Sequence, residues 1–349
     1  MKRLLLLLLL LPYLSPAQIP EYYSSIDFTQ TGNNLKNQLT TLITNTHTTF
    51  LPYTASGTID TWDALSLTDL NPNNTNNVLL IYGWNDSDTD LTNDYSRDKN
   101  LSCHNSSCSG LWSREHVFPR SLGTPNLGFE FAGSDAHNLR AIDAYRNETR
   151  SNLMYEAAPS NVMSYVTPYG NWYPGDEWRG DVARIIMYMY VRYTTQCAPN
   201  VVGAGINTYS TDMPDVFLLW NSQDPVSQYE INRNNILNDL QGNRNPFIDN
   251  PYLATIIWNG PQATNTWEEL SINNNTFSNL VLYPTVTQGI IHLSSNNPNY
   301  TYQVYNTVGQ LVKSSNTSET IDISNNPKGV YFIKVQADDL SKTYKIILN

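Results

Sequence analysis

The sequence predicts an α+β protein in two parts: a mainly helical domain around a short strand–strand–helix unit, and a small all-β sandwich after it. Three observations support this fold class. Apolar residues recur at helical spacing in several segments before residue 260. Residues 112–152 contain two short strand-like runs followed by a helix start. From residue 280 onwards, short apolar runs alternate with turn residues, as in a β-sandwich.

The chain has 349 residues, which is room for about two domains, and it opens like an exported protein. Lys2 and Arg3 precede an unbroken run of leucines, and the segment ends in small residues at Ala17. We therefore predict a signal peptide over residues 1–17 and a secreted protein. No other segment is apolar enough to cross a membrane, so we expect no stable membrane insertion.

The remaining chain is expected to form a domain over residues 18–260, an Asn/Thr-rich linker over residues 261–279 and a β domain over residues 280–349, and to act as a monomer. The formal net charge is −11. This charge argues against broad electrostatic binding of nucleic acid, which favours a basic surface. It does not exclude an enzyme that contacts phosphates through a local cluster, and arginines do gather in residues 112–152.

One helix is expected between Gln18 and Leu51, because apolar residues there form a single stripe. The stripe consists of Leu35, Leu39, Leu42 and Ile43. Residues 52–77 are rich in Thr, Asn, Asp and Pro and predict a loop. A buried strand is expected over residues 78–82, and a second polar loop over residues 84–110.

Three cysteines are present, Cys103, Cys108 and Cys197. An exported chain meets oxidising conditions, so we expect a disulfide. Cys103 and Cys108 are close enough in sequence to close a small loop, and we favour this pair, which leaves Cys197 unpaired. A zinc site that includes the adjacent His104 is the alternative, although few candidate ligands lie nearby.

The residues that could carry chemistry lie within residues 112–152. His116 follows Glu115 at the expected end of a first strand, and a neutral histidine can take a proton from water as a general base does. The run 135–139 is the expected partner strand. Asp143 is the expected N-cap of the helix that follows.

Asn147 and Arg150 lie four and seven residues after this cap, so the two share one face of the helix. Glu115 and Asn147 offer oxygen ligands, the type that Mg²⁺ and Ca²⁺ prefer. A metal ion beside a neutral histidine can hydrolyse a phosphodiester. Because adjacent side chains on a regular strand face opposite ways, Glu115 and His116 can serve one site only if the strand ends or bulges there.

This segment carries the patterns R-E-H-V-x-P, D-x-H-N-L and N-x-x-R-S-N. Three further blocks follow in order: R-G-D-x-A-R from Arg179, a block with Trp220, Asp224-Pro225 and Arg233-Asn234, and Q-G-N-R-N-P-F-I-D from Gln241. Together they resemble the bacterial endonuclease I family, secreted or periplasmic nucleases of the ββα-metal (His-Me finger) type. The resemblance covers roughly residues 20–260.

The resemblance implies a role for each matching residue. His116 is expected to be the general base, Asn147 and Glu115 to hold one divalent metal ion, and Arg120 or Arg150 to bind phosphate. Mg²⁺ is the expected metal, and Ca²⁺ or Mn²⁺ accept similar oxygen ligands. The implied reaction is sequence-nonspecific hydrolysis of DNA, with RNA left open. The other histidine of the segment, His137, is expected to be structural.

Residues 153–178 are rich in Trp, Tyr and Pro and are expected to form an ordered loop whose aromatic side chains pack internally in preference to stacking on bases. Asp181 is expected to start an amphipathic helix, and the R-G-D tripeptide there is interpreted as part of that helix in preference to a cell-adhesion signal. A capping box of Ser227 and Glu230 predicts a helix that ends at Gly242.

The β domain is expected to contain at least five strands, in residues 281–284, 290–293, 302–305, 329–335 and 344–348. Its patterns Y-P, Y-N-x-x-G-Q and K-G-V-Y-F resemble the C-terminal sorting domain of the type IX secretion system of Bacteroidetes. The resemblance implies a partner in that secretion machinery, and a surface-attached or released protein. A carbohydrate- or partner-binding module is the alternative, since no acid–base cluster is present.

Two other functions compete with a nuclease. A secreted binding or adhesion protein could have the same fold without activity, although such a protein would be expected to have lost His116 and Asn147. A metallopeptidase would need H-E-x-x-H, and Glu115-His116 has the wrong order and spacing for that motif.

Overall fold

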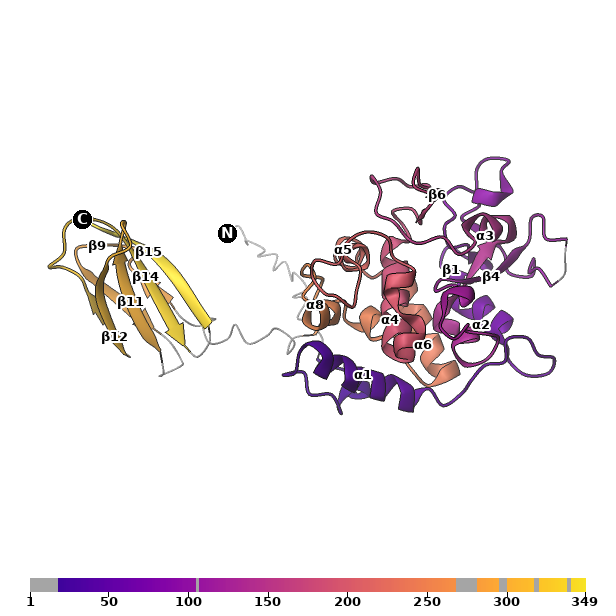
Figure 1. Ribbon diagram of the computed structural model, residues 1–349, viewed down its shortest axis with the longest axis horizontal. Helices are drawn as coiled ribbons and strands as arrows, with labels where there is room; N and C mark the ends of the chain where they lie inside the picture. The colour runs from indigo at the N-terminus through magenta and orange to yellow at the C-terminus, as the bar shows by residue number, and fades with distance from the viewer. Residues whose placement is uncertain (1–17, 105–106, 268–280, 295–299, 317–319, 338–339) are drawn as a thin grey trace, which may run out of the picture. The chain divides into compact units, whose positions relative to one another are not determined.

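The computed structural model describes residues 18–104, 107–267, 281–294, 300–316, 320–337 and 340–349. The chain divides into two compact units, with the boundary between residues 268 and 269. The first unit mixes helices with short sheets and the second is all β, which confirms the predicted α+β class (Figure 1). The predicted signal peptide and the linker beyond residue 267 lie outside the described residues.

The first unit is mainly helical. Its helices are α1 (Gly32–Thr46), α2 (Thr61–Thr68), α3 (Ala144–Arg150), α4 (Arg179–Tyr193), α5 (Asp215–Gln223), α6 (Gln228–Gln241), α7 (Pro246–Asp249) and α8 (Tyr252–Trp258). Its strands are β1 (Leu70–Asn71), β2 (Asn74–Leu79), β3 (Ser96–Asp98), β4 (Trp112–His116), β5 (Leu139–Asp143), β6 (Tyr165–Val166) and β7 (Trp172–Tyr173). The sheets are small: β1-β2-β3, β4-β5 and β6-β7.

Helix α4 lies at the centre of this unit (Figure 1). Most of its side chains are buried, and it packs against α1, α5 and α7. A helix that is buried on nearly every side is a core helix, so the other elements are arranged around it. The helix begins at Arg179, two residues before the predicted start, and Asp181 lies in its first turn with its carboxylate buried. This burial excludes the cell-adhesion reading of the tripeptide.

Helix α2 contradicts the loop predicted for residues 52–77. Asp60 accepts hydrogen bonds from the backbone nitrogens of Trp62 at 2.7 Å and Asp63 at 3.2 Å. The Asp63 carboxylate accepts a hydrogen bond in return from the nitrogen of Asp60 at 3.1 Å. The polar residues that indicated a loop are therefore the capping box of a short helix. The helix predicted between Gln18 and Leu51 is present as α1, which contains the predicted apolar stripe.

Two strand predictions need correction. The strand expected over residues 78–82 is the end of β2, which stops at Leu79, and Tyr82 adopts a left-handed conformation with φ 70°. The partner strand expected over residues 135–139 starts only at Leu139, because Ala136–Asn138 forms a 3₁₀ turn. Asp135 caps that turn by accepting from the nitrogen of His137 at 3.0 Å. Because Asp135 caps this turn, β5 begins only at Leu139.

Strands β4 and β5 and helix α3 form the predicted strand–strand–helix unit. The two strands pair antiparallel, with Glu115 opposite Arg140 and His116 opposite Leu139. Asp143 caps α3, as predicted, by accepting hydrogen bonds at 2.9 Å from the nitrogens of Tyr145 and Arg146. Helix α3 runs along β4, with Asn147 beside Ser113 and Arg150, the last residue of α3, beside Glu115.

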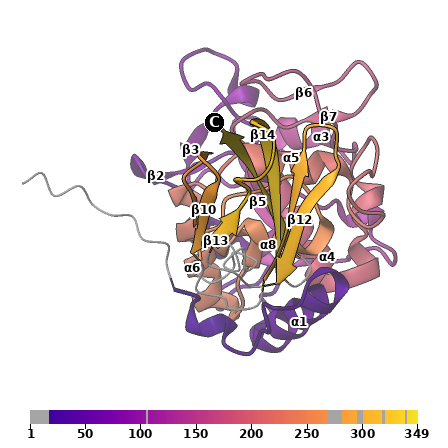
Figure 2. The same cartoon turned by 90° about the vertical axis from the view of Figure 1, so that its left-hand side faces the viewer.

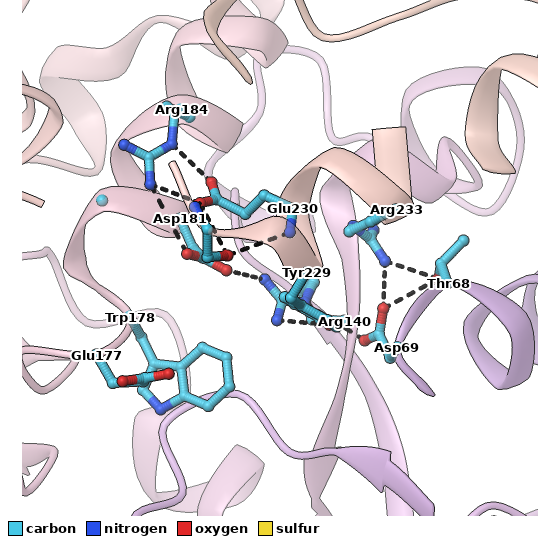
Figure 3. A network of polar contacts seen from close by, with 12 residues as sticks. Thr68, Asp69, Arg140, Glu177, Trp178, Asp181, Arg184, Tyr229, Glu230 and Arg233 are labelled. Atoms are coloured by element: carbon cyan, nitrogen blue, oxygen red, sulfur yellow. Dashed lines mark hydrogen bonds and ion pairs between the residues drawn. The ribbon is translucent and has the colours of Figure 1, made fainter. Parts of the chain in front are cut away.

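A buried network of ion pairs fixes this unit to the helices (Figure 3). Arg140 of β5 donates to the Asp181 carboxylate of α4 at 2.8 Å and lies 3.4 Å from Asp69, which follows α2. Arg233 of α6 pairs with the same Asp69. Arg184 of α4 pairs with Glu230 of α6 at 2.6 Å, a contact that also uses the predicted capping glutamate. The position of β5 is therefore set by three helical segments.

The predicted linker begins later than residue 261. Ala263 and Trp267 are buried in the first unit, and the Trp267 ring lies 4.8 Å from that of Tyr23. The aromatic loop of residues 153–178 is packed as expected, since Trp172 and Trp178 are almost fully buried.

The second unit is a two-sheet sandwich. Its strands are β8 (Val281–Tyr283), β9 (Val286–Thr287), β10 (Ile290–Ser294), β11 (Thr301–Asn306), β12 (Leu311–Asn316), β13 (Thr320–Asp322), β14 (Gly329–Ala337) and β15 (Leu340–Leu348). One sheet has the order β13-β10-β8 and the other β12-β11-β14-β15-β9 (Figures 1 and 2). All five predicted strands are present, and β9, β12 and β13 are additional. Inward-facing residues of both sheets, such as Ile291 and Ile333, form one core.

Candidate active site

One pocket brings together most of the predicted site residues. Its volume is about 300 Å³, and it opens where β4 ends beside α3. The lining residues are Tyr53, Arg114, Glu115, His116, Pro119, Arg120, Ser121, Asn147, Ser151 and Asn152. Adjacent residues Glu115 and His116 both reach this pocket because β4 ends at His116, the condition that strand geometry required.

The His116 imidazole is held in its neutral form. Its Nε2 lies 2.8 Å from the carbonyl oxygen of Gly133. Since a carbonyl can only accept, Nε2 carries the proton and Nδ1 keeps a lone pair. Burial lowers the pKa of His116 to about 3, the Gly133 carbonyl opposes this shift, and Arg120 and Arg114 add to it. The ring is therefore uncharged throughout the physiological pH range.

Glu115 is buried and has two direct partners. Its Oε1 lies 2.9 Å from Nε of Arg150 and accepts a hydrogen bond from the Tyr82 hydroxyl at 3.1 Å. Tyr82 is in turn 2.7 Å from the hydroxyl of Tyr155. Burial raises the pKa of Glu115 to about 7, although Arg150 and Tyr82 both favour the charged form. The carboxylate is thus fixed in place, with the oxygen Oε2 left without a hydrogen bond from any described residue.

Asn147 presents an oxygen to the same pocket. Its amide nitrogen donates to the Ser113 hydroxyl at 3.1 Å and to the backbone oxygen of Arg114 at 3.3 Å. Both bonds orient the side chain from β4, so its carbonyl oxygen Oδ1 is the atom left for a ligand. No described residue donates a hydrogen bond to that oxygen.

The donor set fits a lightly held divalent cation. Glu115 and Asn147 each keep one hard oxygen atom available at the pocket, the ligand type that Mg²⁺ prefers. Among the described residues, no group of three or more His, Cys, Asp and Glu side chains could hold a metal ion. A fully protein-bound metal such as structural zinc is therefore not supported there, whereas Mg²⁺ usually keeps several waters and uses one or two protein ligands plus substrate phosphate.

Two arginines border the pocket. The guanidinium of Arg120 lies 4.0 Å above the ring of Phe129, and that of Arg114 lies 3.5 Å above the ring of Tyr53. Arg114 also donates to the Thr61 hydroxyl at 2.8 Å. Both charges stay at the rim of the pocket, where an anionic ligand can reach them.

Arg150 does not line the pocket, and its burial argues against the predicted role in phosphate binding. Its side chain is fully buried, pairs with Glu115 at 2.9 Å and donates to the backbone oxygen of Val117 at 3.1 Å. Its guanidinium also lies 4.7 Å from the centre of the Tyr155 ring. Arg150 therefore orients Glu115 from behind, a position that the helical spacing of the sequence did not reveal.

His137 occupies a structural position, as expected. Its Nε2 donates to the backbone oxygen of Asn243 at 3.2 Å, and its ring lies 4.4 Å from that of Tyr188. The neighbouring Asp135 accepts from the hydroxyls of Tyr188 at 2.7 Å and Tyr193 at 2.9 Å. These contacts fasten the turn before β5 to α4.

Sequence reasoning missed three residues around the pocket. Tyr82 donates to Glu115, and Tyr155 supports Tyr82. The Tyr53 ring lies 5.7 Å from the imidazole of His116 in a stacked arrangement. Tyr82 and Tyr53 come from segments that lie far from β4 in the sequence, so no local pattern links them to the motif. The left-handed Tyr82 backbone is a signal visible only in the structure.

The disulfide predicted near the site is present in the structure. Cys103 and Cys108 are bonded, and Cys197 is a buried free cysteine. The backbone nitrogen of Cys103 donates to the oxygen of Trp112 at 2.7 Å, so the ring closed by the disulfide abuts the start of β4. His104 instead packs on the ring of Trp62 at 4.5 Å.

Two family models match the chain. The model described as Endonuclease I matches residues 31–252, and the model described as Secretion system C-terminal sorting domain matches residues 281–349. The first match contains the whole pocket, and the second contains the β-sandwich.

Curated relatives also match the chain. The extracellular ribonuclease of Bacillus subtilis strain 168 is 37% identical over 265 residues, which is 72% of this chain and 83% of that protein. The extracellular ribonuclease of Bacillus amyloliquefaciens is 35% identical over 259 residues, 70% of this chain and 81% of the relative. Endonuclease-1 of Buchnera aphidicola subsp. Baizongia pistaciae is 28% identical over 126 residues, 33% of this chain and 46% of that protein.

The fold, the pocket and these matches define a secreted nuclease that carries a sorting domain at its C-terminal end. Within that class the chain belongs to the endonuclease I family. Nucleases of this family generally depend on a divalent metal ion. None of the helices in the described ranges is long and apolar enough to cross a membrane.

Proposed function

We propose that this protein is a metal-dependent, sequence-nonspecific endonuclease that hydrolyses phosphodiester bonds of DNA and RNA. The observation that carries the proposal is the single pocket lined by His116, Glu115 and Asn147. A neutral histidine beside two candidate oxygen ligands at the end of β4 supports a ββα-metal finger. The relatives named extracellular ribonuclease support RNA as a substrate beside DNA.

Glu115 and Asn147 would hold the metal ion, with Mg²⁺ the first expectation and Ca²⁺ or Mn²⁺ accepting the same ligands. A bound cation there would stabilise the charge that develops on the phosphate and on the leaving oxygen. Arg150 and Tyr82 keep the Glu115 carboxylate turned towards the pocket. Their hydrogen-bond and ion-pair contacts are the outer support that ligand carboxylates commonly have.

His116 takes the proton from the attacking water. Donation from Nε2 to Gly133 fixes the tautomer, so that Nδ1 is the atom that accepts the proton. The negative charge of a phosphodiester in the pocket favours the imidazolium form. It therefore raises the pKa of His116 towards the range in which a general base operates. The imidazolium can then release this proton to solvent.

Arg120 and Arg114 bind the phosphate groups. Both guanidinium groups line the pocket. Arg114 uses Nη1 to bind Thr54 and Thr61, which leaves its Nη2 for the oxygens of a phosphate. This local positive charge offsets the net charge of −11 of the whole chain. Weak and strongly salt-dependent binding is therefore expected.

The remaining parts serve export. We infer a signal peptide over residues 1–17 and a type IX sorting signal in the β-sandwich, with the secretion machinery as its partner. The family match of residues 281–349 supports the second inference. The source would then be a bacterium of the Bacteroidetes, and the nuclease would act as a monomer outside the cell.

A plasmid-nicking assay tests the proposed activity. The mature protein is incubated with supercoiled DNA, or with RNA, in Mg²⁺ or in EDTA beside the His116→Ala variant. We expect cleavage that needs the metal and falls about 100- to 10,000-fold in the variant, the usual contribution of a general base. If the wild-type protein cleaves neither substrate with any of Mg²⁺, Mn²⁺ and Ca²⁺, an inactive nucleic-acid-binding protein of the same fold becomes the better description.

A further inference from the structure

A group of exposed aromatic side chains lies next to the pocket. Phe129 is 54% exposed and Phe131 is 60% exposed, although phenylalanine is normally buried. Phe50 is 45% exposed and its ring lies 5.3 Å from that of Phe131. More than half of the Phe129 side chain stays exposed even with Arg120 over one face of its ring, so this ring is available to a ligand.

The exposed rings are continuous with the candidate active site. The Phe129 ring lies 4.9 Å from that of Tyr53, which lines the pocket and stacks 5.7 Å from the ring of His116. Arg120, another lining residue, places its guanidinium 4.0 Å above Phe129. A molecule that occupies the pocket therefore has an aromatic surface directly beside it.

The loop that carries the rings is fixed to the catalytic histidine. Gly133 accepts the hydrogen bond from His116, and its backbone lies so close to Gly128 that an added Cβ would be 2.2 Å from the Gly128 oxygen. Phe131 has a left-handed backbone with φ 50°, an unfavourable conformation for a bulky residue. Such strain persists only where the surroundings hold it, so the tight loop keeps the rings in a set position.

We propose that Phe129 forms a stacking platform for an unpaired nucleobase beside the scissile phosphate, through the part of its ring that Arg120 leaves exposed, and that the enzyme therefore prefers single-stranded nucleic acid. The inference rests on the proposed nuclease function and specifies its substrate. Each nucleobase has a flat π-face that stacks on an aromatic ring irrespective of sequence. In a duplex these faces are covered by neighbouring bases, so only unpaired nucleotides can use the platform.

The surrounding charge fits this occupant. Arg120 lies over the Phe129 ring and Arg114 over the Tyr53 ring, so both offer positive charge next to the apolar face. A single strand presents a base and a phosphate in alternation, which matches ring and guanidinium. A second copy of this acidic chain would instead bring net negative charge to the platform.

The first test compares substrates with and without bases. The kcat/KM of the wild-type, Phe129→Ala, Phe129→Leu and Tyr169→Ala proteins is measured on a single-stranded oligonucleotide and on an abasic strand of the same length. Tyr169 is 84% exposed in the turn between β6 and β7 and does not line the pocket, so it is the matched control. We expect Phe129→Ala to lower kcat/KM on the normal strand about tenfold, Phe129→Leu to recover little of it, and neither to affect the abasic strand.

The second test measures stacking without cleavage. A single-stranded oligonucleotide that contains 2-aminopurine is mixed with each protein in EDTA, where stacking on a ring quenches the fluorescence. We expect quenching with the wild-type and Tyr169→Ala proteins and its loss with Phe129→Ala. The platform would be overturned if Phe129→Ala lowered kcat/KM equally on normal and abasic strands. Quenching that survives in Phe129→Ala would overturn it as well. Quenching by a wild-type protein that cleaves nothing would instead refute only the proposed hydrolysis.

Discussion

Glu115 shows how a single carboxylate depends on residues outside its own motif. The sequence places it beside His116, but its orientation comes from Tyr82 and Arg150, which hold the same oxygen. Neither contact follows from local spacing. The helix face that Arg150 shares with Asn147 suggested a common exposure, and the structure shows that Arg150 points into the core instead. Burial decides whether Arg150 binds phosphate or orients Glu115, and burial depends on the tertiary fold.

Removal of the Tyr82 hydroxyl is expected to weaken metal binding. In Tyr82→Phe, Glu115 loses the hydrogen bond at 3.1 Å and becomes less well oriented. Loss of such an outer contact typically lowers metal affinity about 10- to 100-fold. Calorimetric titration with Mn²⁺ measures this directly. Tyr95→Phe, which removes a hydroxyl bonded to the exposed Glu177, is the control, and equal affinities of both variants would contradict the positioning role.

His137 is expected to make stability depend on pH. Burial lowers its pKa from 6.5 to about 4 in the folded protein, although Asp135 opposes the shift. Below pH 6.5 the unfolded chain therefore binds a proton that the folded chain does not. The neutral His137 therefore contributes its full share to the free energy of unfolding above pH 6.5. As the pH falls from 6.5 towards 4, this free energy decreases by up to about 1.4 kcal/mol per pH unit.

The matched variant for this effect is His137→Gln, whose side chain does not titrate. Urea unfolding of both proteins at pH 7, 6 and 5 gives the difference between their free energies of unfolding. The wild-type protein should lose its advantage as the pH falls. A difference that is the same at all three values would show that the proton uptake of this histidine is not linked to folding.

Among the elements, those with a local signal were predictable. The capping box of Ser227 and Glu230 and the C-terminal Gly242 located α6, and Asp143 located α3. Helix α2 was missed because it has only eight residues and begins in polar sequence. The start of β5 was misplaced because Asp135 caps a turn, a contact that strand propensity does not include.

The buried ion-pair network is expected to determine how firmly β5 is held. Arg140→Ala would leave Asp181 and Asp69 without a shared partner in the interior. Removing one member of such a buried pair typically costs about 3–5 kcal/mol. Thermal and urea unfolding measure the loss. Lys36→Ala, which breaks a partly exposed pair with Asp212, should cost at most about 1 kcal/mol. Similar losses in both variants would contradict a special role of the network.

For the whole molecule, the sequence indicated two domains because the composition changes near residue 260. It could not locate the end of the first domain, because the burial of Ala263 and Trp267 is a long-range contact made in an Asn/Thr-rich stretch. Each unit has its own core. The activity and the export signal therefore lie in different units.

Removal of the second unit is expected to leave the nuclease intact. A chain of residues 18–274 keeps the pocket and every contact described for it. Its cleavage rate should match that of the longer protein. Its melting temperature should match that of the first unfolding transition of the longer protein. Export from the producing cell, measured as activity in the medium, should be lost when the same deletion is made in the gene. Secretion of the shortened protein would show that the β-sandwich does not carry the export signal.

The disulfide at the start of β4 has a consequence for the cell that makes this protein. The ring of Cys103 and Cys108 supports the strand that ends in His116, and such bonds rarely persist in the cytoplasm. A newly made chain therefore carries two thiols at this point while it is near the chromosome. The disulfide closes only after export, so the chain has less covalent support at β4 in the cytoplasm than outside the cell.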